Sequence, residues 1–190
     1  SGVRKFQELL DNFPTSNLRR EARLWQAKAE FFMKKEDEAV KILQELYTDA
    51  RSEGDNDVLF NLLMIQAQIS YVHLDVAQAA TLYALASEVS VDGQRRAAAS
   101  YLLGLTYERS GDPPKAAEAY GRVRNFRPDF ALEFQSRLHW ARMLALANQQ
   151  RTALKVLDEL FDEPLRSDEK SLVDLEIANT DWAMGDTASA

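Results

Sequence analysis

Among the residue types that carry enzymatic or metal chemistry, this 190-residue chain has 30 aspartates and glutamates, two histidines and no cysteine. Carboxylates on helix faces are the usual surface of a soluble helical protein. The absence of cysteine excludes disulfides, thiolate catalysis and cysteine-type zinc sites. The two histidines, His73 and His139, lack the i, i+4 spacing that places two imidazoles on one helix face around a metal. A single histidine in a helical sequence is usually a surface or half-buried residue, and we expect this of both.

The segment Asp55-Asn56-Asp57 is similar to the start of a calcium-binding loop. Such a loop needs glycine at its sixth position and glutamate at its twelfth, and the twelfth residue here is Gln66. We therefore interpret the segment as a turn. The glycines form neither a GxGxxG pattern nor a P-loop, and no nucleophile, base and orienting group come together. We expect no catalytic, cofactor-binding or metal site, and no enzyme activity in this chain.

The composition is that of a folded protein, with 46% hydrophobic and 28% charged residues. The net charge of -7 disfavours nucleic acid as a partner, because nucleic-acid binding needs a basic surface. No apolar run reaches the roughly 20 residues that span a bilayer. The densest acidic stretch is either a solvated rim or a docking site for a basic partner; it contains Asp158, Glu159, Asp162, Glu163, Asp168 and Glu169.

Internal repetition is the strongest signal in the chain. Small residues recur with spacings of 40, 37, 37 and 37 at Ala27, Ala67, Gly104, Ala141 and Ala178. A second set with the same spacings is Ala39, Ala79, Ala116, Ala153 and Ala190. Four residues after each of its first four members stands a large apolar residue: Leu43, Tyr83, Tyr120 and Leu157. The run Arg23-Leu24 recurs as Arg137-Leu138. Repetition of this length predicts stacked helix pairs.

Residues 97–130 resemble the tetratricopeptide repeat. They contain Leu103-Gly104-x2-Tyr107, then Gly111-Asp112, a small residue, an aromatic residue and a closing Pro128 at that family's spacing. The departures are Ser100 where the family often has tryptophan, Val123 where it prefers alanine, and a period of 37 where it usually has 34. The extra residues predict a near-turn added at each junction.

The resemblance implies an all-α fold, a right-handed α-solenoid of antiparallel helix pairs. The small residues permit close helix packing, and Pro113-Pro114 begins a second helix where a missing N–H does no harm. We expect helices at 3–12, 17–33, 36–52, 57–73, 76–90, 94–110, 113–126, 130–147, 150–162 and 168–184. Residues 1–190 form one domain in this interpretation, with helix-pair units at 17–54, 57–92, 94–130 and 131–166.

The ends of the chain read as incomplete units. Residues 1–14 match the second half of a preceding unit, and residues 167–190 match a truncated one in which Gly185-Asp186 repeats the turn at Gly111-Asp112. We therefore expect a fragment of a longer array, whose exposed apolar end favours pairing with another copy.

The resemblance also implies a binding groove lined by the first helix of each pair. Three positions per unit point into it: three before, one after and four after the small residue. Leu24, Leu105, Leu138 and Leu175 at these positions are expected in the core, whereas Phe31 and Tyr71 could equally pack between helices. The candidate partner-binding residues are Lys28, Phe31, Met64, Gln68, Tyr71, Tyr101, Glu108, Arg142, Asn179 and Trp182.

The function expected from this resemblance is a scaffold that binds a protein or peptide partner in the groove. Two alternatives remain open: a spacer or self-assembly segment of a larger envelope-associated protein, or a regulatory domain of an enzyme whose catalytic domain lies elsewhere. The stretch from Phe6 to Ser16 resembles segments of bacterial periplasmic and outer-membrane-associated repeat proteins, which favours a bacterial envelope location over the cytoplasm. The sequence names neither the partner nor the process.

Overall fold

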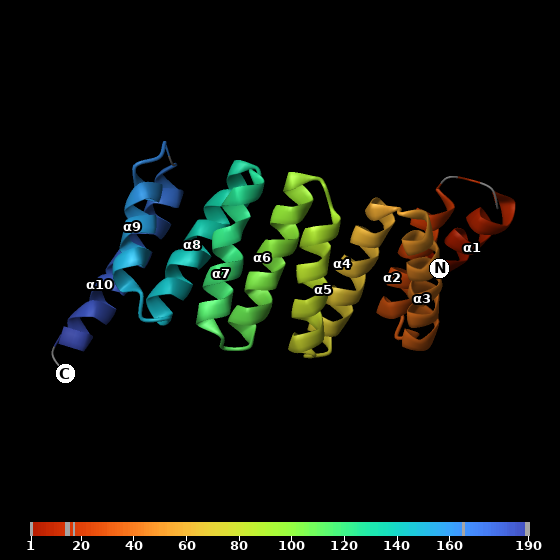
Figure 1. The fold of residues 1–190 in the computed structure, drawn as a ribbon, viewed down its shortest axis with the longest axis horizontal. Helices are drawn as coiled ribbons and strands as arrows, with labels where there is room; N and C mark the ends of the chain where they lie inside the picture. Colours follow the sequence, from red (N-terminus) through yellow and green to blue (C-terminus); the bar gives the residue numbers. More distant parts are fainter. Residues whose placement is uncertain (1, 14–15, 17, 165, 189–190) are drawn as a thin grey trace. The chain divides into compact units, whose positions relative to one another are not determined.

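A computed structural model describes residues 2–13, 16, 18–164 and 166–188. Within these ranges the chain forms ten α-helices, one short 3-10 helix and no β-strand (Figure 1). The elements are α1 (Gly2–Asn12), α2 (Arg19–Phe32), α3 (Glu36–Glu53), α4 (Asn56–Val72), α5 (Val76–Val89), α6 (Gly93–Arg109), α7 (Pro113–Val123), η1 (Arg124–Phe126), α8 (Phe130–Leu146), α9 (Gln150–Phe161) and α10 (Ser167–Ala188). The expected all-α class is confirmed.

The helices alternate between two roles. We call α2, α4, α6, α8 and α10 the A helices, and α1, α3, α5, α7 and α9 the B helices. The A helices α2, α4, α6 and α8 each pack against the B helix that follows them, and α10 packs against α8 and α9. This is the expected solenoid of antiparallel helix pairs. No helix among the described residues is both long and apolar enough to cross a membrane.

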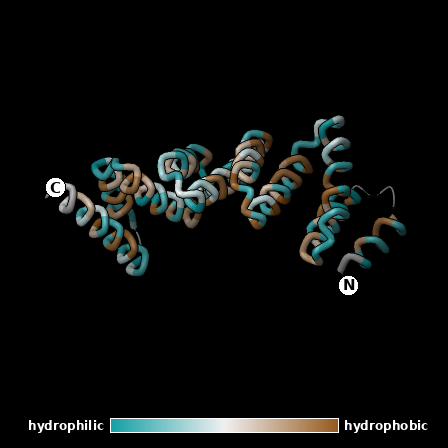
Figure 2. The backbone as a smooth tube through the Cα atoms, turned by 90° about the horizontal axis from the view of Figure 1, so that it is seen from below, coloured by the Kyte–Doolittle hydropathy of each residue, from teal (hydrophilic) through white to brown (hydrophobic). Residues whose placement is uncertain are grey.

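The helices group into two compact units, which are described separately. The first unit, Ser1–Val91, contains α1 to α5, and the second, Asp92–Ala190, contains α6 to α10. Their boundary coincides with the junction expected between the helix pairs at 57–92 and 94–130. Along the helices of both units, hydrophobic and hydrophilic residues alternate (Figure 2).

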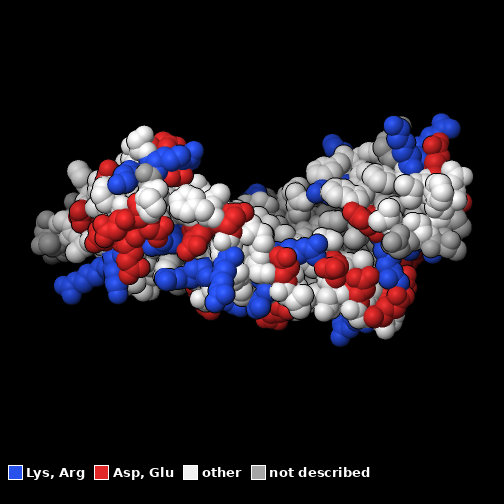
Figure 3. All heavy atoms as spheres, turned by 90° about the horizontal axis from the view of Figure 1, so that it is seen from above, with Lys and Arg blue, Asp and Glu red and all other residues white. Residues whose placement is uncertain are grey.

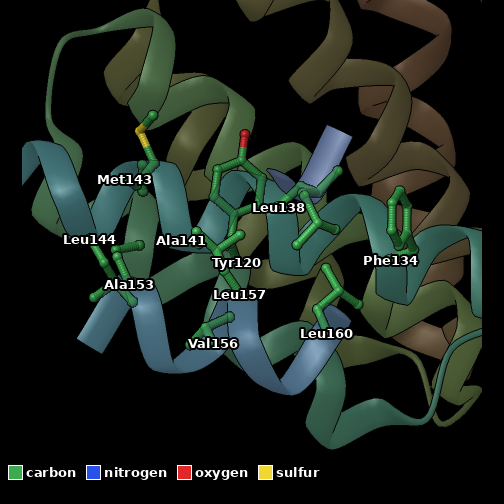
Figure 4. Packing of buried hydrophobic residues seen from close by; sticks show 13 residues of the cluster. Tyr120, Phe134, Leu138, Ala141, Met143, Leu144, Ala153, Val156, Leu157 and Leu160 are labelled. Atoms are coloured by element: carbon green, nitrogen blue, oxygen red, sulfur yellow. The ribbon is translucent and has the colours of Figure 1, made fainter. Parts of the chain in front are cut away.

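The repeated small residues lie where A and B helices touch. Ala27, Ala67 and Ala141 are 0% exposed, and so are all four described members of the second set: Ala39, Ala79, Ala116 and Ala153. At Gly104 a Cβ atom would lie 2.6 Å from the ring of Tyr120. In the second unit this ring is buried among Leu138, Ala141 and Leu157 (Figure 4). The predicted repeat register therefore matches the packing from α2 to α9. Ala178 on α10 was predicted to be equivalent but is exposed, because no following helix among the described residues packs against it, and Ala190 lies outside the described residues.

Aspartates cap the helices in a repeating pattern that sequence reasoning missed. Asp55, Asp92 and Asp129, each 37 residues apart, precede α4, α6 and α8, and each accepts a hydrogen bond from a backbone N–H in the first turn. Asp75 and Asp112 cap α5 and α7 in the same way. Such caps satisfy N–H groups that have no partner inside the helix. The expected turn at Asp55-Asn56-Asp57 is thus the start of α4.

The turns from A to B helices share one backbone conformation. Lys34, Leu74, Gly111 and Asn148 stand seven residues after the small residue of their units, and all have positive φ, between 60° and 73°. This left-handed conformation reverses the chain in few residues, and it favours glycine or asparagine over other residue types. Lys34 and Leu74 adopt this left-handed conformation although their side chains disfavour it.

One expected turn is wrong. Gly185-Asp186 was predicted to repeat the turn at Gly111-Asp112, but α10 continues through both residues to Ala188. At the earlier site Pro113 and Pro114 follow directly and lack the N–H that a continuing helix needs. No proline follows Asp186, so the pattern of glycine and aspartate alone does not end the helix.

Candidate functional site on the A helices

Three aromatic rings from successive helices of the second unit pack together. Tyr101 on α6 lies 5.5 Å from Tyr120 on α7, measured between ring centroids. The imidazole of His139 on α8 lies 5.7 Å from Tyr101 and 5.1 Å from Tyr120. Ring pairs at these separations attract beyond the area that they bury. The predicted groove residue Tyr101 is therefore held rigidly by its neighbours.

The carboxylate of Glu108 connects the helices that carry these rings. Its Oε2 accepts a hydrogen bond of 2.6 Å from the hydroxyl of Tyr120 and lies 2.9 Å from Nδ1 of His139. Burial raises the pKa of the Tyr101 phenol, and the charge of Glu108 adds to the rise. His139 is half-buried, as expected, but its link between α6 and α8 was not foreseen, because the sequence does not show that it faces Glu108.

Arg142 on α8 forms an ion pair with Glu176 on α10. The Glu176 side chain is 8% exposed, whereas 48% of the Arg142 side chain remains exposed. The hydrogen bond to Glu176 raises the pKa of the Arg142 guanidinium, and the charge of Glu176 adds to the rise. The predicted groove residue Arg142 thus has one edge fixed by the protein while the rest of its side chain faces solvent.

The first unit has a different set of contacts. The ammonium group of Lys28 lies 5.4 Å from the centroid of the Trp25 ring, a cation–π geometry. Phe31 packs edge-on against Phe32 and lies 5.6 Å from the ring of His73. Phe31 therefore packs between helix pairs, one of the two placements considered for it. Met64 and Tyr71 are half-buried, and Gln68 is exposed.

An exposed row on the A helices was missed by the sequence interpretation. Phe32, Val72 and Leu146, five residues after the small residue, are 65%, 55% and 61% exposed. They stand four residues after Lys28, Gln68 and Arg142, so each pair shares one helix face. The position four after the small residue, which was predicted to face the groove, holds half-buried side chains in α2, α4, α6 and α8.

The leucines expected in the core fall into two groups. Leu24 and Leu138 are buried, at 3% and 8% exposure, which confirms the expectation, and Leu105 is half-buried. The expectation for Leu175 is wrong, because 56% of it is exposed. Among the described residues only α8 and α9 pack against α10, and they cover its other side. Asn179 and Trp182 are also exposed, Trp182 at 75%.

The recurring arginines bind their own helix pair. Arg23 on α2 pairs with Glu45 on α3, and Arg137 on α8 lies 4.0 Å from Glu159 on α9, the same 22 residues further along. Arg137 also pairs with Glu163. Acidic side chains of the second unit gather beside basic ones in Figure 3. Basic side chains of the protein itself therefore neutralise part of the predicted acidic rim. This makes the rim less suited to docking a basic partner.

No arrangement suited to metal chemistry occurs among the described residues, where no three His, Asp or Glu side chains converge. The A-helix face instead offers fixed rings, one half-exposed guanidinium and exposed apolar side chains. Such groups are suited to contacting another protein.

Comparison with known proteins agrees with this geometry. A family model described as the tetratricopeptide repeat matches residues 21–50 and 98–129. The chain contains tetratricopeptide repeats. No curated protein matches it in sequence.

Two solved structures share the tetratricopeptide repeat fold with this chain. One is a putative kinesin light chain from Podosopora anserina with nearly identical repeats of this type; it has a TM-score of 0.64, 16% identity, and coverage of 92% of this chain and 91% of the other. The other is MamA, with a TM-score of 0.56, 14% identity, and coverage of 99% and 90%. Tetratricopeptide repeats commonly form scaffolds for protein–protein interaction.

Proposed function

We propose that this chain is a protein-interaction module that holds a peptide or protein partner against its A helices. The observation that carries the proposal is the fixed cluster of Tyr101, Glu108, Tyr120 and His139 beside the half-exposed Arg142. Aromatic and arginine side chains are the residues that most often dominate binding energies at protein interfaces. Because these side chains are already ordered by contacts within the protein, they lose little conformational freedom when a partner binds.

The contacts available suggest an extended partner that lies across the A helices of a unit. On α8, Gln135, Arg142 and Leu146 are exposed at intervals of seven and four residues and form one row. Along the helix this row presents, in order, the amide of Gln135, the guanidinium of Arg142 and the apolar side chain of Leu146 to a partner. A partner with an apolar side chain near a hydrogen-bond acceptor matches Leu146 and Arg142. The proposal assigns no reaction to this chain.

The test is capture of partners from the lysate of the source organism by the chain and by two matched variants. Leu146→Glu places a charge in the exposed apolar row without touching the core. Lys155→Glu also makes the protein more negative, but at an exposed position of the B helix α9. A partner lost by the Leu146 variant and retained by the Lys155 variant supports the proposal. Retention by the Leu146 variant with loss by the Lys155 variant places binding on the B helices and overturns it.

Self-association is a second candidate, favoured by one face of α10. Leu172, Leu175 and Trp182 are 46%, 56% and 75% exposed, and helical spacing places them in one row. Exposed apolar rows of this kind often mark contact surfaces. Light scattering over a range of concentrations distinguishes the two candidates: Trp182→Ser should abolish a concentration-dependent mass increase if α10 joins two copies, and a constant monomer mass contradicts association.

A further inference from the structure

A crevice on the B-helix side of the first unit differs from its counterparts in size and chemistry. It lies between α1, α2 and α3 and has a volume of about 770 Å³. The crevice beside α3, α4 and α5 has about 340 Å³, and the one beside α7 and α8 about 350 Å³. A volume of 770 Å³ falls in the range of sites that hold small ligands or peptide side chains.

The repeat register shows how the lining of this crevice differs from that of the crevice beside α7 and α8. In the second unit the corresponding space is lined by Trp140 and Leu144, one before and three after the small residue Ala141. In the first unit the same two positions hold Gln26 and Glu30. Large apolar side chains thus line the crevice beside α7 and α8, and polar side chains line the one between α1, α2 and α3.

Most polar groups in the crevice already bind one another. Arg23 pairs with Glu45. The amide of Gln26 donates to Oε1 of Gln7 at 3.3 Å, and the amide of Gln7 donates to Asp11 at 2.9 Å. These contacts occupy the middle of the crevice and join α1, α2 and α3.

Glu30 is different. Its side chain is 8% exposed, it lines the crevice, and its Oε2 accepts no hydrogen bond. The ammonium group of Lys35 stands 3.5 Å away, close enough to attract the carboxylate, and the Lys35 side chain is 49% exposed. A buried carboxylate oxygen without a hydrogen-bond donor is unfavourable, and a donor that reaches it gains a charge-assisted bond.

A second carboxylate stands at the same end. Because α2 and α3 are antiparallel, Glu38 near the start of α3 lies beside the end of α2 that carries Glu30. Arg19 lines the opposite end of the crevice, at the start of α2. Lys41, one turn after Glu38 on α3, also lines the crevice. The two carboxylates Glu30 and Glu38 at one end can together accept from a cation with several N–H donors.

We propose that this crevice binds the guanidinium group of an arginine side chain from a partner peptide, with Glu30 and Glu38 as acceptors. The planar guanidinium presents donors in a fork that matches carboxylates, and it loses less hydration than an ammonium group when buried. The site is separate from the A-helix face, so one chain can hold a partner at both surfaces.

The test is a titration of the ¹⁵N-labelled chain with Nα-acetyl-L-arginine amide, followed through the side-chain amide resonances of Gln7 and Gln26. Nα-acetyl-L-citrulline amide is the matched probe, with nearly the same shape and no charge. The arginine probe should shift both resonances in the millimolar range, and the citrulline probe should leave them unchanged. Equal shifts with both probes overturn the proposal.

Variants locate the acceptor. Glu30→Gln keeps the shape of the side chain, removes its charge and should weaken binding of the arginine probe roughly tenfold. Glu118→Gln, in the corresponding crevice of the second unit, should have no effect. If circular dichroism shows that the Glu30 variant does not fold, the exposed Glu38→Gln variant replaces it, with a weakening of several-fold expected. Undiminished affinity in a folded Glu30 or Glu38 variant contradicts the assignment.

Discussion

The ring of Tyr120 lies directly against the backbone of Gly104, so that a Cβ atom at position 104 would stand 2.6 Å from the ring carbon Cδ1. Glycine inside a helix costs about 1 kcal/mol relative to alanine. Tyr120 is 1% exposed, and its hydroxyl also bonds Glu108 on the helix that carries Gly104. The contact between these two residues therefore aligns α6 with α7 and positions the groups proposed to bind a partner.

Gly104→Ala should lower the free energy of unfolding by up to about 2 kcal/mol. Overpacking costs about 1–3 kcal/mol, and the better helix propensity of alanine offsets about 1 kcal/mol of it. Chemical denaturation measures the change. The double variant Gly104→Ala with Tyr120→Leu combines an alanine with a smaller side chain, as Ala27 and Leu43 do at the equivalent positions, and this relieves the clash. The stability lost by the double variant should therefore be smaller than the sum of the losses of the two single variants. Simple additivity contradicts direct contact between the two positions.

The helices of this fold were predictable from the sequence because the repeated small residues mark the positions where the helices of a pair touch. Every small residue of the register that the structure describes is buried except Ala178 on α10, since helices can approach closely only where side chains are small. The end of α10 was mispredicted because Gly185-Asp186 repeats the residue types of the turn at Gly111-Asp112, and these two residue types alone do not end a helix.

The candidate site was less predictable, because its contacts join different repeats. Arg142 lies 34 residues from Glu176 in sequence, and His139 lies 31 residues from Glu108. Column positions state which residues share a helix face, but they do not fix the rotation of one A helix against the next. The prediction placed the position four after the small residue in the groove, whereas the exposed residues Phe32, Val72 and Leu146 stand five after it, which is one residue further around the helix.

Leu74→Gly should stabilise the first unit by about 0.5–1 kcal/mol, because Leu74 has φ 64° in a turn and its side chain is 63% exposed. Glycine adopts this conformation without steric cost, and little buried surface is lost. Thermal unfolding measures the gain. Leu74→Ala retains a Cβ atom and should give no such gain, so an equal effect of both substitutions contradicts the conformational explanation.

Tyr83→Phe should move the alkaline unfolding midpoint to higher pH. Burial raises the pKa of the Tyr83 phenol to about 12, and the charge of Tyr71 adds to the rise. Because the folded pKa lies above the unfolded value of about 10, the contribution of the neutral phenol is complete below about pH 10 and is lost as pH rises toward 12. Circular dichroism against pH measures the midpoint, with the stability of both proteins at pH 7 as the reference. An unchanged difference in stability from pH 7 to 12 contradicts the role of Tyr83.

Arg142→Ala should affect both stability and partner binding, and the ion pair with Glu176 provides a way to separate them. The substitution leaves a carboxylate of 8% exposure without its guanidinium. The expected cost is about 1–2 kcal/mol, at the low end for a buried group because Arg142 is itself half-exposed and screened by solvent. Adding Glu176→Gln removes the unpaired charge and should restore most of the stability.

The proposed binding surface lacks the guanidinium in both proteins, so both should bind a captured partner equally weakly although they differ in stability. Urea denaturation and calorimetric titration with that partner measure the two quantities. Recovery of affinity together with stability in the double variant would mean that Arg142 acts only by holding α10 against α8, whereas persistent loss of affinity identifies its exposed edge as a contact of the partner.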